Sequence, residues 1–166
     1  MANVFEPDLE PPAESDPPGF RVSGASVGRE AGSRALGASL YEMPPGEAIC
    51  PYHWHEANEE MLIVLSGRPR VRTPDGWRQL GPGEVVAFPR GKEGAHQVDN
   101  QGSEVARVLM ISEMNTPEVV LYPDSDKVGV RSPAPGSAPV EGELRARFKL
   151  DTAVDYWLDE RPPETE

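Results

Sequence analysis

Three histidines and one nearby carboxylate are the residues of this sequence best suited to chemistry. His53 and His55 stand two residues apart, and Glu60 follows five residues after His55. His96 lies close to a turn rich in glycine and proline, and no other histidine occurs among the 166 residues. Neutral imidazoles and carboxylates are ligands that divalent transition metals favour. The spacing therefore indicates a single metal site.

Strand geometry would bring these side chains together. Side chains alternate between the two faces of a strand, so His53 and His55 are expected to point the same way. A short turn leads into the next apolar segment, where Glu60 shares its face with Leu62 and is expected to point inward. Glu59 would then point outward into solvent. Glu60 is therefore preferred to Glu59 as the third ligand.

The elements that must hold this site are short strands. Glycine and proline divide the chain between residues 20 and 131 into apolar segments, and the strands are expected at 35–43, 60–65, 68–73, 77–80, 84–88, 95–99 and 106–111. Turns recur at intervals of roughly 8–12 residues, and no segment shows a sustained helical period. The pattern predicts an all-β sandwich or barrel.

Arms rich in proline and acidic residues flank this central domain. We expect an extended arm at 1–19, a barrel at 20–131, and a linker and tail at 132–166. Within the tail, the sequence predicts a strand at 144–150 and a short amphipathic helix at 152–160. Tyr156 and Trp157 are expected to pack on the barrel or on a second subunit.

Charge and composition exclude several classes of partner. The arms carry −5 and −4 of the net charge of −12, so no basic stripe is present to bind nucleic acid or an anionic membrane surface. The longest apolar run, 61–65, is too short to span a bilayer. The N-terminus has no secretory-signal pattern, and Cys50 is the only cysteine, so an internal disulfide is excluded. A cytoplasmic protein is expected, with Cys50 as a small buried side chain in preference to a reactive thiol.

Two ordered motifs resemble those of the cupin superfamily, in particular small single-domain bacterial cupins. The first is His53-Trp54-His55, four residues, Glu60, six residues and Gly67, preceded by Gly46. The second runs from Gly83 through Pro89-Arg90-Gly91 and His96 to Asn100. Two departures from the family pattern occur: Gly46 lies one residue further from the first histidine, and two extra residues precede His96.

The resemblance implies a double-stranded β-helix, which is the jelly-roll barrel of the cupins. It also implies one divalent transition metal bound by four residues, His53, His55, Glu60 and His96. Such a donor set suits Mn, Fe, Ni, Zn or Cu and does not choose among them. It would leave one or two coordination positions open to polarise a substrate oxygen or to bind water or dioxygen. A barrel without a metal is the alternative.

Three further residues are candidates for substrate binding. Arg70 and Arg72 share one face of a predicted strand and could anchor an anionic substrate, although a solvated or salt-bridged face is the alternative. Glu93, in the segment that carries the two extra residues, is the only carboxylate whose position suggests a proton relay.

Cupin barrels serve several functions, so three hypotheses stay open. The first is a small metalloenzyme of the isomerase, decarboxylase or dioxygenase type. Its substrate would be an oxygen-rich small molecule, such as a sugar phosphate or a keto or hydroxy acid. The second is a non-catalytic module that binds or senses a small ligand. The third is a barrel kept for assembly, with a structural metal. A homodimer is expected because barrels of this type often pair through their outer sheets.

Overall fold

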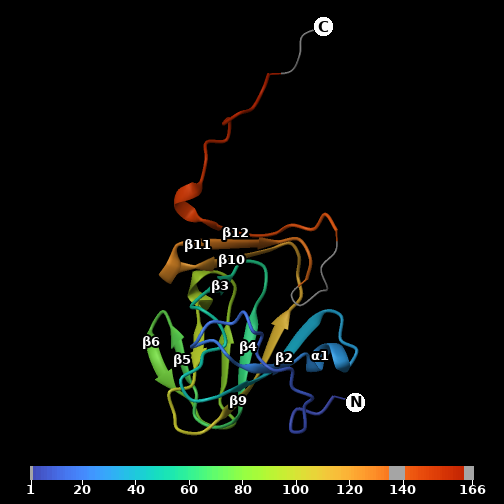
Figure 1. The fold of residues 1–166 in the computed structure, drawn as a ribbon, viewed down its shortest axis with the longest axis vertical. Coiled ribbons are helices and arrows are strands. Elements are labelled where there is room, and N and C mark those ends of the chain that lie inside the picture. The colour runs from blue at the N-terminus through green and yellow to red at the C-terminus, as the bar shows by residue number, and fades with distance from the viewer. Residues whose placement is uncertain (1, 135–140, 163–166) are drawn as a thin grey trace.

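The computed structural model describes residues 2–134 and 141–162, and its strands form three antiparallel sheets (Figure 1). The largest sheet has the order β1-β2-β9-β4-β7, with the bounds β1 (Ser23–Ala25), β2 (Leu36–Met43), β9 (Ala106–Glu113), β4 (Glu60–Ser66) and β7 (Val85–Phe88). The second sheet has the order β6-β5-β8, with β6 (Gly76–Gln79), β5 (Arg70–Thr73) and β8 (Gln97–Asp99). These two sheets are the walls of a barrel.

Apolar side chains from both walls fill the barrel. The buried core consists of Met43, Leu62, Val64, Val71, Leu80, Phe88, Val98, Ala106, Val108 and Met110. Alternate residues of β4 and β9 are buried while their neighbours are more exposed, as a strand with one face on a core requires. The predicted all-β, double-stranded β-helix architecture is confirmed.

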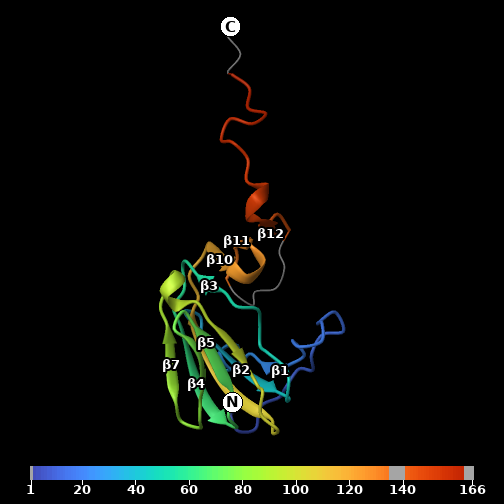
Figure 2. The ribbon, with the colours of Figure 1, turned by 90° about the vertical axis from the view of Figure 1, so that its left-hand side faces the viewer.

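A third layer lies across one end of the barrel (Figures 1 and 2). Its strand order is β12-β11-β10-β3, with β12 (Arg145–Lys149), β11 (Lys127–Arg131), β10 (Glu118–Tyr122) and β3 (Trp54–His55). The pairing of Val120 on β10 with His55 on β3 joins this layer to the segment that carries two of the histidines. The end of the barrel nearest the histidines is therefore the end that the third layer covers.

Short helical turns complete the fold: α1 (Val27–Glu30), η1 (Lys92–Gly94), η2 (Pro123–Ser125) and η3 (Leu150–Thr152). Residues 2–19 of the N-terminal arm form bends and turns, and the arm contacts β1 through a bridge between Glu10 and Gly24. Among the described residues, no helix has the length and apolar character needed to cross a lipid bilayer.

One glycine of the first motif has a clear structural reason. Gly67 follows β4 with a φ of 77°, a left-handed conformation that side chains rarely adopt. A Cβ atom at this position would lie 2.6 Å from the Cα atom of Ala106. Gly67 therefore lets the chain turn tightly against β9.

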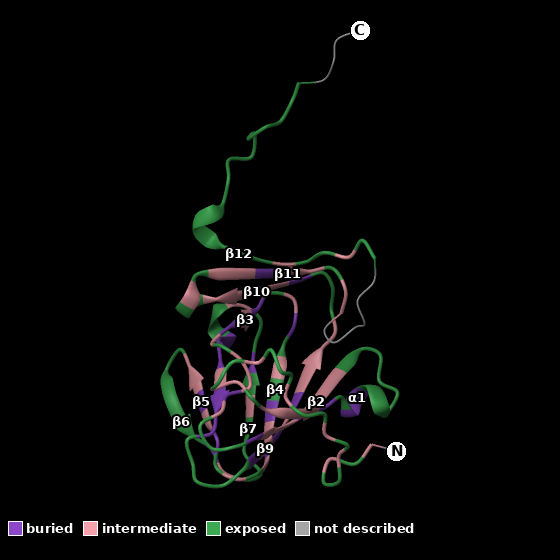
Figure 3. Ribbon diagram, viewed as in Figure 1, coloured by how far each residue is buried: buried purple, intermediate pink, exposed green. Residues whose placement is uncertain are grey.

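The C-terminal tail differs from its prediction in one respect. The strand expected at 144–150 is present as β12, but the helix expected at 152–160 is not formed, and only the single turn η3 precedes an exposed chain (Figure 3). A helix this short is marginal unless its apolar face packs on something. Tyr156 and Trp157 are 80% and 72% exposed, so neither packs on its own barrel.

Candidate metal centre

The structure brings the four predicted metal ligands to one cavity at the covered end of the barrel. His53 precedes β3 and His96 precedes β8, and the two are joined by reciprocal backbone hydrogen bonds of 3.1 and 2.8 Å. His55 belongs to β3, and Glu60 is the first residue of β4. All four positions are thus fixed by β-type backbone pairing.

The ligand atoms of these side chains converge. His53 Nε2 lies 3.0 Å from His55 Nε2, and Glu60 Oε2 lies 3.5 Å from His55 Nε2 and 3.2 Å from His96 Nε2. One ligand atom from each of His53, Glu60 and His96 lies within 4.8 Å of the others. This His/Glu cluster could hold a metal ion.

The second nitrogen of every ring faces an acceptor. Nδ1 of His53 lies 2.9 Å from the carbonyl oxygen of Pro51, and Nδ1 of His96 lies 2.9 Å from that of Gly94. Nδ1 of His55 lies 3.2 Å from Oε2 of Glu118. Each Nδ1 is therefore assigned as the protonated donor, which leaves the Nε2 lone pairs directed at the centre of the cluster.

Such an arrangement calls for a cation. Lone pairs on His53 Nε2 and His55 Nε2 repel each other at 3.0 Å, and buried Nε2 of His96 has no hydrogen-bond partner among the described residues. Burial, followed by repulsion from the other two histidines, lowers the pKa of His53 to about 3. Although burial raises the pKa of Glu60, the three imidazoles outweigh it and lower that pKa to about 2. Neutral imidazole and ionised carboxylate are the protonation states that metal binding requires.

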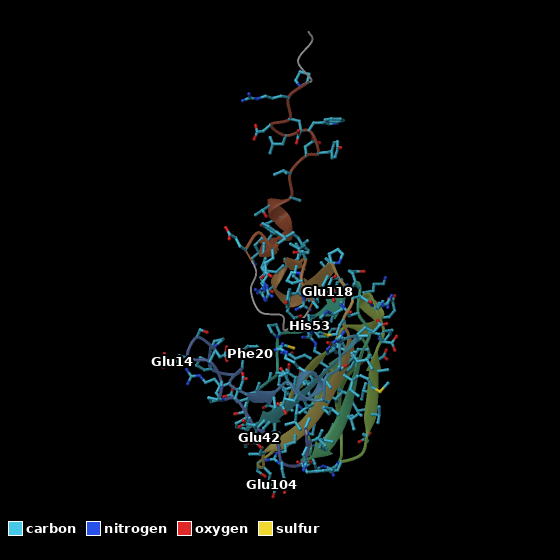
Figure 4. The ribbon with its side chains drawn as sticks, turned by 90° about the vertical axis from the view of Figure 1, so that its right-hand side faces the viewer. Glu14, Phe20, Glu42, His53, Glu104 and Glu118 are labelled. Carbon is cyan, nitrogen blue, oxygen red and sulfur yellow. The ribbon has the colours of Figure 1, made fainter. Side chains whose placement is uncertain are left out.

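Glu118 is a part of the site that the sequence did not reveal. It lies on β10, is 1% exposed, and accepts hydrogen bonds from His55 Nδ1 and from the backbone N–H of Ala57. The side-chain amide of Asn58 also donates to it. Figure 4 places His53 and Glu118 where the barrel meets the β10–β12 layer. A buried glutamate in a strand is unusual unless it is paired. Its burial therefore marks Glu118 as a residue of the site, and no sequence motif does so.

The two extra residues before His96 form a supporting turn. They belong to η1, whose last residue, Gly94, presents the carbonyl that accepts from His96 Nδ1. A Cβ atom on Gly94 would lie only 1.7 Å from the carbonyl oxygen of Pro89, so the turn packs directly on the preceding loop. The ring of Phe88 stacks on His96 with centroids 3.8 Å apart. The insertion therefore orients the ligand and does not displace it.

The structure does not bring the three predicted substrate-binding residues to the cavity. Val71 lies in the core, so its neighbours Arg70 and Arg72 on β5 point to the opposite face. There the Arg70 guanidinium donates two hydrogen bonds to Asp99, of 3.0 and 2.7 Å, and Arg72 pairs with Asp124. Glu93 is exposed in η1 and does not line the cavity either. All three residues therefore lie outside the cavity that holds the His/Glu cluster.

Residues other than Arg70, Arg72 and Glu93 line the cavity beside the His/Glu cluster. The cavity has a volume of about 450 Å³. Besides the cluster, polar and charged side chains line it: Ser26, Arg29, Ser33, Arg34, Ser39, Tyr41, Cys50, Ser112 and Arg131. Three arginines therefore face this space, from α1, from the loop after it and from β11. They come from parts of the chain outside both sequence motifs, so motif spacing could not identify them.

Comparison with known proteins agrees with this architecture. Residues 39–112 match the family model described as a cupin domain. A solved structure from Acidithiobacillus ferrooxidans, assigned provisionally as a sugar phosphate isomerase, is 25% identical, with a TM-score of 0.74 over 98% of this chain and 93% of that chain. No curated protein matches the chain.

Two more distant structures show the same fold. A sugar phosphate isomerase of the cupin superfamily from Silicibacter pomeroyi is 21% identical, with a TM-score of 0.73 over 88% of this chain and 91% of that one. A predicted oxalate decarboxylase from Thermotoga maritima is 18% identical, with a TM-score of 0.57 over 68% of this chain and 97% of that one. Both share the barrel described above. Residues 39–112 therefore form a cupin domain.

Proposed function

We propose that this protein is a metal-dependent enzyme of the sugar phosphate isomerase type. One observation carries the proposal: three imidazole nitrogens and a carboxylate converge, with their lone pairs directed inward, on the wall of a cavity of about 450 Å³. Cavities of about 300–1,000 Å³ are typical of sites for small molecules. The substrate class is therefore a small, oxygen-rich molecule.

His53, His55, Glu60 and His96 would hold the metal ion in this proposal. The donor set suits one divalent transition metal and does not select among Mn, Fe, Ni, Zn and Cu, so metal availability in the cell would decide which ion binds. When bound, such an ion supplies Lewis acidity that polarises a carbonyl or hydroxyl oxygen. Glu118 keeps His55 in the tautomer that binds metal, since it accepts from the ring's Nδ1.

Two further observations favour isomerase chemistry over the other types that cupins support. The Acidithiobacillus ferrooxidans structure is similar to this chain over nearly all of both proteins, and its provisional assignment is to this reaction class. The phenol of Tyr41 lines the cavity, and burial raises its pKa, so it stays protonated and can donate to a substrate oxygen. Decarboxylation and oxygenation are the other reactions to be tested in the same assays.

A non-catalytic binding module is the second candidate, and one observation favours it. Among the described residues that line the cavity, Glu60 is the only carboxylate, and it is already placed in the metal cluster. An enzyme that moves protons between carbon atoms needs a base within reach of them. If no base other than a metal ligand serves, the cavity would bind its ligand without turnover.

Metal content tests the first half of the proposal. Elemental analysis of purified wild type should give about one transition metal ion per chain. We expect the Glu60→Gln and His53→Ala variants to lose most of it, whereas Glu59→Gln, the matched change at the neighbouring exposed carboxylate, should keep it. Equal metal content in Glu60→Gln and Glu59→Gln would contradict the assigned site.

Solvent exchange tests the second half. An isomerase working through proton transfer should incorporate deuterium from D₂O into an aldose or ketose phosphate, next to the carbonyl carbon, as seen by NMR. Parallel assays of carbon dioxide release and oxygen uptake cover the other two reactions. Tight binding of a sugar phosphate with no exchange, release or uptake would favour the binding module.

A further inference from the structure

Arg131 is a half-buried arginine of the cavity whose Nε atom has no hydrogen-bond partner among the described residues. Arg131 is the last residue of β11 and lines both the metal-centre cavity and a smaller adjoining one of about 160 Å³. Its Nε atom is buried without a hydrogen bond, and within residues 2–134 and 141–162 its guanidinium forms no ion pair. A buried N–H donor of a charged group is unfavourable without an acceptor, so a partner for this nitrogen is expected.

Two carboxylates, Glu118 and Glu60, act on Arg131 electrostatically but do not serve as that partner. Glu118 and Glu60 both act on Arg131 electrostatically, but burial dominates and lowers the pKa of the guanidinium. The carboxylate of Glu118 already accepts from His55, Asn58 and Ala57. Glu60 faces the imidazoles of the cluster. Neither carboxylate is placed to form a direct bond with Arg131.

The charge of the cavity as a whole points the same way. The protein carries a net charge of −12, yet the described residues that line this cavity include three arginines and one carboxylate. Arg29 and Arg34 stand with Ser26 and Ser33 on the wall formed by α1 and the loop after it. A positive cavity in an acidic protein concentrates small anions against the field of the surrounding surface.

We propose that Arg131 binds the anionic group of the ligand, either a phosphate monoester or a carboxylate, while the rest of the molecule extends toward the His/Glu cluster. The planar fork of a guanidinium matches both groups and can donate two parallel hydrogen bonds to either. The second half of this statement rests on the proposed function. The first half, an anion site at Arg131, does not.

Titration of full-length, metal-free protein with inorganic phosphate tests the anion site. In parallel titrations, acetate represents a carboxylate and glycerol a neutral ligand, all at constant ionic strength and followed by calorimetry. We expect one phosphate or acetate per chain and no binding of glycerol. Losing a charge-assisted pair should weaken binding by about 10- to 100-fold in Arg131→Gln. Arg131→Lys, which keeps the charge but not the fork, should recover part of the affinity.

Arg72→Gln is the matched control, because Arg72 is ion-paired outside the cavity. It should bind phosphate and acetate as wild type does. Equal affinity of Arg131→Gln and Arg72→Gln, or no anion binding by wild type, would overturn the proposal. Near-ultraviolet circular dichroism of each variant shows whether the fold is intact. Whichever of phosphate and acetate binds with the higher affinity identifies the anionic group that the site prefers.

The His53→Ala variant separates this inference from the proposed function. If it loses the metal but still binds the anion, the metal centre and the Arg131 site are independent and both stand. If wild type binds the anion but never takes up a metal, the proposed function fails alone. If wild type takes up the metal and Arg131→Gln binds the anion as tightly as wild type does, only the Arg131 inference fails.

Discussion

Glu118 lies outside both sequence motifs, yet it orients one of the proposed metal ligands, His55. The histidines make direct contact with the ion in the proposed function, but each ring must also be held in one tautomer and one orientation. For His53 and His96 a backbone carbonyl does this, whereas His55 depends on the side chain of Glu118 on the paired strand β10. A side chain can be exchanged by mutation and a carbonyl cannot, so His55 is where orientation can be tested.

Replacing Glu118 with glutamine should weaken metal binding without emptying the site. The amide is nearly isosteric but carries no charge to polarise His55, and loss of such a partner typically costs about 10- to 100-fold in metal affinity. Competition with a chromogenic chelator measures this. Glu56→Gln, at an exposed acid whose side chain accepts a hydrogen bond from Trp54 Nε1, is the control. Unchanged affinity in Glu118→Gln would show that the contact with His55 has no role in binding.

Cys50 should be unreactive while the protein is folded. Burial, followed by the charge of Glu60, raises the pKa of the thiol from 9.0 to about 12. At pH 8 the thiolate fraction is then far smaller than in an unfolded chain, so labelling by a disulfide reagent should be slow until urea is added. The unfolded thiol ionises first, so stability should fall as the pH rises from 9 toward 12. Rapid labelling of folded protein at pH 8 would refute this.

At the scale of elements, alternation of apolar residues predicted most of the barrel. The strands at 35–43, 60–65 and 106–111 correspond to β2, β4 and β9 within about two residues. Strands β10 and β11 were not predicted. In β10 the charged Glu118 is buried where the pattern calls for an apolar residue. The prediction of a helix at 152–160 was wrong for a different reason. The amphipathic pattern is present, but these residues are exposed, and no described part of the chain packs against them.

The same reasoning explains which part of the site could be predicted. The four metal ligands lie on two motifs whose spacing is set by strands and turns, so local sequence brought them together. Arg131 reaches the cavity only through the pairing of β11 with β10, a long-range contact that no local pattern encodes. Arg70 and Arg72 share one face, as alternation predicts, but alternation does not tell whether that face looks into the barrel, and here it looks outward.

Strand β4 allows a matched test of which face is the core. Leu62 is completely buried, whereas its neighbour Met61 is 38% exposed. We expect Leu62→Ala to lower the free energy of unfolding by about 2–5 kcal/mol, through lost apolar contact and the cavity left behind. Met61→Ala should cost clearly less. Urea unfolding compares them, and similar losses would mean that the assigned face is wrong.

At the scale of the whole molecule, β12 pairs with β11, but the described part of the tail beyond it, residues 150–162, is exposed throughout. Several large apolar side chains are exposed on β12 and beyond it: Phe148, Leu150, Val154, Tyr156, Trp157 and Leu158. The tail runs away from the barrel in both views (Figures 1 and 2). Clustered exposed apolar residues commonly mark contacts between proteins. The expected homodimer, and the cytoplasmic location, both stay predictions.

Light scattering at micromolar concentrations tests the homodimer. We expect wild type to have twice the mass of one 18.1 kDa chain. If the tail contributes to the interface, a Tyr156→Ser, Trp157→Ser double variant should shift the equilibrium toward the monomer, while Trp77→Ser, at an exposed tryptophan on β6, should not. A monomeric mass for wild type across the whole concentration range would rule the dimer out.

The backbone hydrogen bonds between His53 and His96 affect the stability of the fold when no metal is bound. In a zinc finger the ligands are ordered only when the ion arrives, so removing the ion unfolds the domain. Here the ligand segments are already fixed by main-chain hydrogen bonds and by the core beneath them. Little chain ordering is left for the ion to bring about. The metal-free protein should therefore persist as a folded receptor, able to exchange one ion for another as supply changes.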